Sequence, residues 1–488
     1  MARIPPWILP VTMTAVVYYP IVHNYFFADD FYNFWYLANE GAARFALLPH
    51  AGHSHVTRNV IIAVWYALFG MQPAPYLAFA LLNHLLNVYL LFQVAHALTG
   101  SSRIAAIVAG LWGIAPAQEQ TIGWFAVYGQ VLAATCSLWV LWGLARCRAG
   151  ATIRRVTPWL WGLALIVGIL SFAIGLGLAL VMPLVAWLLL PPERQRKRIA
   201  AILALAAVVG VAVYVGQRRL FEALYGQVLW TVAPQAILAH WLEYAGYLLS
   251  LAGYGIVALL VGPWDSATHP AETLSAATLA VVGLLAAVVV WRAPARTTRL
   301  LLACALIAVA VYTPIAVGRE QFVTATNQAW MVRTPRYQYG GMIAAALAVG
   351  VVAAGLRGRK HRPEWINTLA MLACASAAVA LRLAVGPPVD HYGAALTETA
   401  AVLQNIEATA AAAAPGSDVY ITNRPFNAAV APFHDFPGWA AVFAIFSPDN
   451  SFAGHRLRFV VTAPGDLATT HQGRRAPELL CAPPPKDQ

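Results

Sequence analysis

Long apolar runs, separated by short polar segments, follow one another through most of the chain. A helix that crosses a membrane needs about 20 apolar residues, and fewer where it is broken inside a bundle. Runs of this kind occupy residues 7–27, 76–98, 104–118, 124–145, 199–215, 240–261, 274–291, 300–317, 337–356 and 365–385. The pattern predicts an all-α polytopic membrane protein with about 11 to 13 transmembrane helices.

Three stretches predict something other than a simple span. Residues 159–190 are long enough to cross twice and lie between two basic clusters, which predicts a hairpin of two short helices. Residues 59–69 are amphipathic and end at Gly70, which predicts a helix that lies on the membrane surface. Residues 220–239 must cross back or re-enter the membrane if the spans on both sides of them run outward.

The pattern changes after residue 386, where no apolar run is long enough to span a membrane. An alanine-rich amphipathic stretch at 392–413 predicts a helix, and the runs 419–422 and 457–462 predict strands. We therefore expect a transmembrane domain over residues 1–386 and a small α/β domain over residues 387–488.

Composition and charge agree with a membrane protein. Hydrophobic residues make up 60% of the chain and charged residues 10%, whereas soluble domains carry about 25% charged residues. The net charge is +11, and basic residues gather between apolar runs at 146–155, 193–198 and 357–362. This distribution follows the positive-inside rule and gives no support to a nucleic-acid partner. It predicts that residues 28–58 and 387–488 lie on the outer side of the membrane.

Two adjacent acids, Asp29 and Asp30, follow the first apolar run. They open a polar loop over residues 28–58 that also contains Glu40, Arg44, His50, His53, His55 and Arg58. A carboxylate at a membrane surface is costly unless it is hydrated, paired or used, so the pair is a candidate general base. Acids also belong at helix N-termini, and the pair could instead cap a helix that starts at Phe31. The density of charged and histidine side chains favours the functional interpretation.

The histidines of this loop raise the question of a metal. His53 and His55, with His50, lack the helical spacing of a zinc protease motif, and no cysteine lies near them. The five cysteines form no disulfide or metal framework. We predict no metal site; a divalent cation stays open as a cofactor but is not favoured.

Polar residues also lie inside or at the ends of the predicted spans. His84 lies within the run 76–98, and Glu119 follows the outer end of the third span. Such residues in lipid are functional candidates, although His84 could equally pack between helices through hydrogen bonds. Glu119 should share the outer face with Asp29 and Asp30.

The order of these features resembles a known family. The features are the acid pair, Arg58 before an amphipathic helix, Asn83-His84-Leu85-Leu86-Asn87, a basic turn at Arg103, and Pro116-x-x-Glu119 followed by Trp124. This order looks like the N-terminal half of GT-C membrane glycosyltransferases. It is most similar to the multi-span part of the tetratricopeptide-bearing O-mannosyltransferases, and more distantly to protein O-mannosyltransferases and lipid A aminoarabinose transferases. The matching region covers residues 20–146.

The chain departs from that family in three ways. The histidine that follows the proline of the third span in the family is absent, since the chain reads Pro116-Ala117-Gln118-Glu119. Gln130 stands where an arginine is expected near the start of the fourth span, and no tetratricopeptide repeat follows. Fold and reaction type therefore transfer better than the identity of the acceptor.

The resemblance implies an enzyme that transfers a hexosyl or pentosyl group, with inversion, from a polyprenyl-phosphate donor. The acceptor would be a glycan, a lipid or a protein at the periplasmic face. Asp29 or Asp30 would be the general base, with Glu119 as a further catalytic candidate. Candidate substrate contacts are His53, His55, Arg58, His84 and Trp124.

The leaving phosphate would need donors, and the planar guanidinium of arginine suits this role better than the ammonium of lysine. The candidates are Arg319, Arg333, Arg336, Tyr337 and Arg218. Most of them lie in residues 318–337, where arginines on the predicted outer side run against the positive-inside rule. The alternative for this segment is an Arg/Tyr anchor at the membrane interface.

Two other classes of protein stay open. An O-antigen ligase or polymerase would also use a lipid-linked sugar, but it would place its key His and Arg residues in a large late loop. A transporter or flippase for lipid-linked sugars would need charges along an intramembrane path and often has two similar halves. The sequence shows no internal repeat and few charges within spans.

Overall fold

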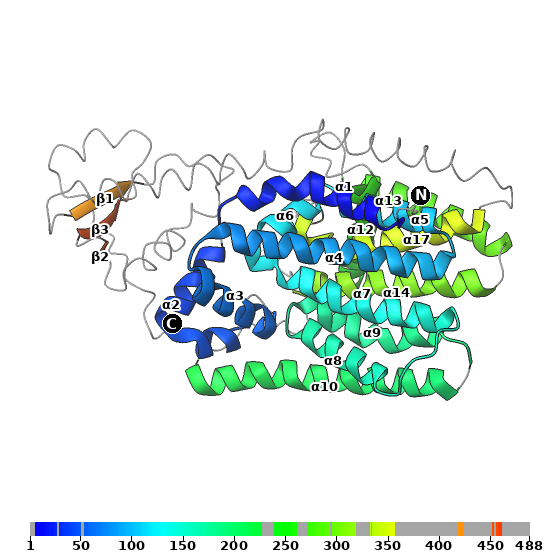
Figure 1. Cartoon of the computed structure of the whole chain (residues 1–488), viewed down its shortest axis with the longest axis horizontal. Coiled ribbons are helices and arrows are strands. Elements are labelled where there is room, and N and C mark those ends of the chain that lie inside the picture. The colour runs from blue at the N-terminus through cyan, green and yellow to red at the C-terminus, as the bar shows by residue number, and fades with distance from the viewer. Residues whose placement is uncertain are drawn as a thin grey trace.

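The computed structural model describes residues 5–26, 29–49, 53–192, 194–226, 239–260, 271–292, 295–318, 332, 334–356, 418–422, 451–452 and 455–460. Its N-terminal part is a bundle of helices that lie side by side (Figure 1). Within the described residues strands occur only near the C-terminus. The polytopic all-α body predicted from the sequence is confirmed.

The first half of the bundle starts with a helix that is broken at Pro20. Its elements are α1 (Ile8–Tyr18), η1 (Tyr19–His23), α2 (Asp29–Leu47), α3 (Val56–Phe69), α4 (Pro73–Thr99), α5 (Ser102–Gly113), α6 (Gln118–Gly123), η2 (Phe125–Val127) and α7 (Gly129–Arg148). The second half comprises α8 (Thr157–Ile169), α9 (Ala173–Leu189), α10 (Arg194–Tyr225), α12 (Trp241–Leu260), α13 (Ala271–Arg292), α14 (Ala295–Val317), η3 (Pro335–Tyr337) and α17 (Gly341–Leu356).

Five described segments are long and apolar enough to cross a membrane: Pro73–Thr99, Phe125–Arg148, Arg194–Tyr225, Trp241–Leu259 and Thr297–Val317. Shorter apolar helices include α3, α5, α8 and α9. These helices make the chain a multi-pass membrane protein. The predicted span 365–385 lies outside the described residues.

The structure confirms one irregular prediction and corrects two boundaries. Residues 159–190 form the expected hairpin, α8 and α9, with a turn at residues 170–172. The predicted span 104–118 is wrong in length, because α5 ends at Gly113 and the chain turns around Pro116 before α6. Residues 220–225 continue α10 and do not begin a re-entrant segment, whereas residues 227–238 lie outside the described part.

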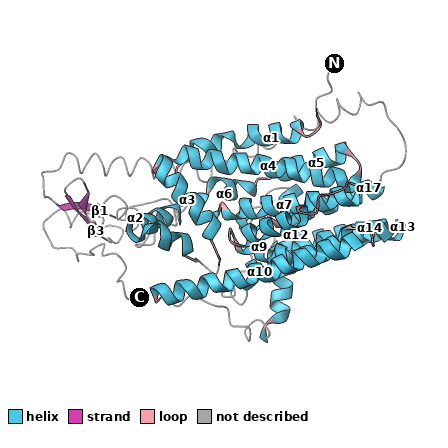
Figure 2. Ribbon diagram, turned by 60° about the horizontal axis from the view of Figure 1, so that its bottom comes forward, coloured by secondary structure: helices cyan, strands magenta, loops and turns pink. Residues whose placement is uncertain are grey.

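The two ends of the bundle differ in charge. Figures 1 and 2 both place α2 near the last turns of α10, and Gln217 of α10 donates a hydrogen bond to the carbonyl of Leu47. The connection between α7 and α8 lies at the opposite end in Figure 1, together with the start of α10. The acid pair and the basic clusters at 146–155 and 194–198 are therefore separated by the length of the bundle, which is the separation that the positive-inside pattern predicts.

Three short strands form a sheet near the C-terminus. The strand order is β1 (Asp418–Thr422), β3 (His455–Val460) and β2 (Ser451–Phe452), with β1 parallel and β2 antiparallel to β3. Strand β1 contains the predicted run 419–422, and β3 overlaps the predicted run 457–462. The predicted helix 392–413 lies outside the described residues, so the α/β domain over 387–488 stays a prediction.

Helices α9 and α14 pack at backbone distance. A Cβ atom added at Gly177 of α9 would lie 1.8 Å from the carbonyl oxygen of Ala310 and 3.1 Å from Pro314. Small residues allow such close approach between membrane helices, whose association depends on van der Waals packing. The proline within α14 lies at this contact, where the neighbouring helix covers it.

We expect Gly177→Ala to destabilise the protein by about 1–3 kcal/mol, because the obstructing atom is backbone and cannot move aside. The measurement is the midpoint of thermal unfolding of the purified protein in detergent. Gly216→Ala is the matched control, since nothing lies within 4 Å of a Cβ at that position of α10. Equal midpoints for the two variants would contradict the close packing of α9 on α14.

Candidate functional site

The two acids begin α2 but lie in different surroundings. Both occupy the first turn of the helix, where the helix dipole favours negative charge. Asp30 is only 2% exposed, and its Oδ1 accepts a hydrogen bond from the backbone N–H of Ala126 at 2.5 Å. Asp29 is half-buried and keeps access to solvent. Asp30 therefore ties α2 to η2, a contact 96 residues away in the chain.

Arg58, in the first turn of α3, binds the other backbone polar group of the same residue. It is 4% exposed, and its Nη1 donates to the carbonyl of Ala126 at 2.6 Å. Its remaining donors reach Asn33 Oδ1 at 3.1 Å and Asn59 Oδ1 at 2.7 and 3.0 Å. Arg58 and Asp30 thus fix both the N–H and the carbonyl of Ala126.

Burial and the neighbouring charges shift the pKa of Arg58 in opposite directions. Burial lowers the pKa of its guanidinium to about 9, while the nearby carboxylates of Asp29 and Asp30 raise it. The group is therefore a cation at neutral pH. It offsets part of the negative charge that the acid pair brings to this end of the bundle.

The second half of α2 supports this cluster. Gly41 has φ 81°, a left-handed conformation that glycine adopts at little cost, and it breaks α2 into two helical segments. The later segment brings the carbonyls of Phe45 and Leu48 to Asn59, whose Nδ2 donates to them at 2.6 and 3.1 Å. Asn59 thus donates its amide N–H groups to backbone carbonyls around the end of α2, and its side-chain oxygen accepts from Arg58.

An arginine from the late part of the chain reaches the same turn. Arg336 of η3 lies with its guanidinium 5.0 Å from the centre of the Trp124 ring and 4.9 Å from that of Tyr337. Its backbone N–H donates to Gln120 Oε1 at 3.1 Å. A cation over an aromatic face is stabilised by the ring quadrupole. Trp124 is two residues from Ala126, so the late arginine and the early acids meet on one short turn.

His84 helps to position η3. Its side chain is completely buried, with Nε2 3.1 Å from the carbonyl of Gly113 and Nδ1 2.9 Å from the hydroxyl of Tyr339. A carbonyl only accepts, which assigns the proton to Nε2 and lets Nδ1 accept from the tyrosine. The same hydroxyl accepts from Asn87 Nδ2 at 3.1 Å, and Trp112 Nε1 donates to the Tyr339 carbonyl at 3.2 Å. These contacts support the packing interpretation of His84.

His53 and His55 contact the turn of the α8–α9 hairpin. The ring of His53 stacks on Phe172 at 4.2 Å, and His55 Nδ1 lies 3.3 Å from the carbonyl of Ser171. His55 is buried. Both histidines therefore join the polar loop to the hairpin, and their role as substrate contacts stays a prediction.

The other predicted site residues divide into two groups. Glu119 lies half-buried in the first turn of α6, which packs against η3, and Arg218 contacts the Tyr214 ring on α10. Arg319, Arg333 and His50 lie outside the described residues. Among the residues that the structure describes, no group of three or more His, Cys, Asp or Glu side chains is placed to hold a metal ion.

The sequence interpretation missed three amides that complete the site: Asn33, Asn59 and Gln120. All three are buried. A signal existed for Asn59, because a polar residue next to Arg58 at the start of an otherwise apolar helix needs partners when buried. Asn33 and Gln120 carry no comparable signal, since their partners depend on contacts across 25 and 216 residues.

Comparison with known proteins gave limited similarity. No family model matches the chain, and no curated protein matches it. Two solved structures are similar: ArnT from Cupriavidus metallidurans in the apo state, with 16% identity and a TM-score of 0.36, covering 95% of this chain and 88% of that one. The second is the same protein bound to undecaprenyl phosphate, with 14% identity and a TM-score of 0.36, covering 94% and 86%. Similarity at this level does not identify the residues of a functional site in this chain.

Arg58→Lys should destabilise the protein strongly although it keeps the charge. Lysine cannot reproduce the fork that serves Ala126, Asn33 and Asn59, and each hydrogen bond lost from a charged group costs about 1.5–3 kcal/mol. The measurement is again the thermal midpoint in detergent, with Arg299→Lys at an exposed position as the control. A midpoint for Arg58→Lys equal to that of the control would show that the fork does not hold the turn.

Proposed function

We propose that this protein is a glycosyltransferase that moves a sugar from a polyprenyl-phosphate donor to an acceptor at the end of the bundle that carries the acid pair. The observation that supports this most is the convergence of Asp30, Arg58 and Arg336 on the turn between Trp124 and Ala126. As a result, the carboxylate of Asp30 and the guanidinium of Arg336 contact residues of the same short turn, Ala126 and Trp124. Acid–base chemistry and phosphate binding need both kinds of group at one place.

The different surroundings of the two acids give them different roles. Asp30 is buried and uses its carboxylate on the Ala126 N–H, so we assign it a positioning role. Asp29 is half-buried and next to it, so we assign it as the general base. Asp29 would accept the proton of the acceptor hydroxyl as that oxygen bonds to the anomeric carbon. The bond from the anomeric carbon to the phosphate oxygen breaks, and polyprenyl phosphate leaves with the electron pair.

Arg336 is the described residue best placed to bind the leaving phosphate. Its side chain lies over Trp124 and beside Tyr337, and η3 is fixed by Gln120 and by the Tyr339 network. Within the described part of the chain no ion pair with a carboxylate occupies its guanidinium. A phosphate that gains charge as it leaves is stabilised by such a preorganised cation. Arg319 and Arg333 are further proposed donors on the basis of the sequence.

Periplasmic orientation and the bacterial inner membrane belong to the same proposal. The orientation rests on the separation of the acid pair from the basic clusters, and the bacterial inner membrane rests on the resemblance of the sequence to GT-C glycosyltransferases. The sugar and the acceptor stay open, and so does the alternative of a flippase or of an O-antigen ligase or polymerase.

The proposal is tested by incubating the purified protein with radiolabelled polyprenyl-phosphate sugars and a bacterial envelope extract. Label that moves to an acceptor supports the transferase. Donor that binds without turnover would support the flippase instead. Transfer of a labelled, pre-assembled lipid-linked glycan to lipopolysaccharide, with no transfer from single-sugar donors, would support the ligase class.

Asp29→Asn should lower turnover by about 10²–10⁴-fold, the usual contribution of a general base, and leave the thermal midpoint close to that of the natural protein. Asp30→Asn should lower the thermal midpoint as well, because its carboxylate accepts the Ala126 N–H. Turnover and midpoint are measured on the same preparations, with Glu243→Gln at an exposed ion pair as the control. Full turnover in Asp29→Asn would remove Asp29 from the mechanism.

Arg336→Gln should weaken binding of undecaprenyl phosphate by about 10- to 100-fold, the effect of losing one charge-assisted hydrogen bond. Arg336→Lys should recover part of the affinity, since the charge returns without the planar fork. Binding is measured by tryptophan fluorescence or native mass spectrometry, with Arg299→Gln as the control. An unchanged affinity in Arg336→Gln would leave η3 as an interfacial anchor only.

A further inference from the structure

A second polar site lies at the other end of the bundle. A cavity of about 390 Å³ opens between the connection that follows α7 and the first turns of α8 and α10. Its lining includes Arg154, Arg155, Arg194 and Arg198, and no lining residue is acidic. None of these residues takes part in the sugar-transfer site.

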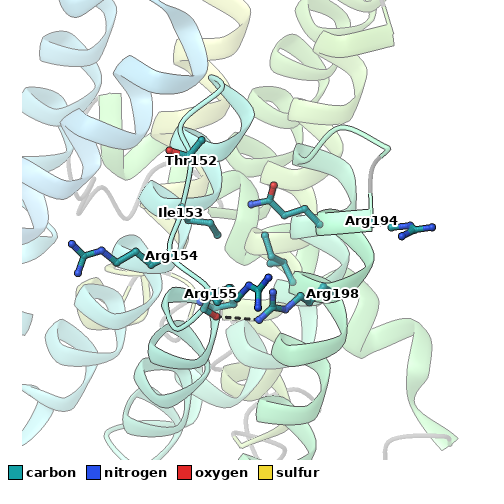
Figure 3. A pocket seen from close by; sticks show the side chains of 9 residues that line it. Thr152, Ile153, Arg154, Arg155, Arg194 and Arg198 are labelled. Carbon is teal, nitrogen blue, oxygen red and sulfur yellow. Dashed lines mark hydrogen bonds between the residues drawn. The ribbon is translucent and has the colours of Figure 1, made fainter.

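Two of the arginines lie side by side. In Figure 3 a dashed line joins the Arg198 side chain to Arg155, whereas Arg154 and Arg194 point away on either side. Arg198 Nη2 donates a hydrogen bond to the backbone carbonyl of Arg155 at 3.3 Å. Within the described part of the chain neither guanidinium pairs with a carboxylate; Glu193, which precedes α10, lies outside that part. Cations that line one cavity repel each other, and an anion bound in the cavity offsets that repulsion.

The backbone adds positive potential to the same cavity. Pro158 in the first turn of α8 and Gln195 in the first turn of α10 both line it. The first turn of a helix carries the positive end of the helix dipole. Neither helix has an acidic residue in its first turn. Two positive helix ends and the arginine pair therefore act on one small volume.

Apolar side chains continue from the cavity along both helices. On α8, Trp159, Leu160 and Leu163 are exposed, the last by 58%, and on α10 Leu205 and Val208 are exposed, the last by 66%. In a membrane protein such surfaces face acyl chains. A molecule with a phosphate in the cavity and hydrocarbon along α8 and α10 matches both surfaces at once.

We propose that this cavity binds the phosphate headgroup of an anionic membrane lipid, held by Arg155 and Arg198. Basic pockets between membrane helices are suited to such headgroups, and each arginine near the surface strengthens binding. The chemistry in the cavity is that of a phosphate monoanion or dianion. The apolar flanks assign the lipid, and not free phosphate, as the occupant.

Native mass spectrometry of the full purified chain tests the proposal with three probes. These are cardiolipin, phosphatidylcholine with the same acyl chains, and inorganic phosphate. We expect cardiolipin to bind more tightly than the other two, and R155Q/R198Q to weaken it by about 30-fold. R103Q/R299Q removes two basic residues that do not line the cavity and is the matched control, with a change of less than about two-fold because separated surface charges are screened.

Further variants separate this site from folding and from the donor site. R155K/R198K keeps both charges and should keep most of the affinity. Arg336→Gln should leave cardiolipin binding unchanged, since it acts at the opposite end of the bundle. Equal losses in R155Q/R198Q and R103Q/R299Q, or no loss in either, would overturn the proposal. Inorganic phosphate that binds the natural protein as tightly as cardiolipin would overturn the assignment of a lipid.

Discussion

The site depends on one residue, Ala126, whose backbone N–H and carbonyl are each held by a buried charged side chain. Asp30 accepts the N–H of Ala126 and Arg58 donates to its carbonyl, so two side chains from the first polar loop fix a turn that lies far along the chain. Burying a single charge at this place would be costly, and burying opposite charges that are hydrogen-bonded reduces that cost. The turn then presents Trp124 to Arg336. Without this clamp the early acids and the late arginine would have no shared platform.

The clamp also explains why neighbouring acids are not equivalent. Asp30 gives up solvent access in order to hold the turn, and this leaves Asp29 beside it with part of its surface in water. In the reaction proposed above, the carboxylate that takes a proton must reach its substrate, whereas the one that holds a backbone N–H must not move. Adjacent positions at the start of a helix allow both conditions to be met within one turn.

Much of the helical body could be predicted from the sequence, because burial in lipid imposes long apolar runs with few exceptions. The hairpin at residues 159–190 followed from length and flanking charge together. The third span could not be bounded in the same way, since apolar residues continue past Gly113 although the chain turns at Pro116. The amide partners of Arg58 and Arg336 were beyond sequence reasoning, because their contacts join segments whose separation no periodicity encodes. The sequence singles out Asp29 and Asp30 together as candidates, and only the burial of Asp30 distinguishes them.

Helix α10 sets a length scale for the whole molecule. Its 32 residues rise about 1.5 Å each, or about 48 Å in total, which exceeds the hydrocarbon thickness of about 30 Å. This one helix therefore carries Arg198 of the arginine pair near its N-terminus and, near its C-terminus, Gln217, which contacts the end of α2. A tilt of α10 would therefore displace Arg198 at its start and the contact with α2 near its end at the same time, in opposite directions.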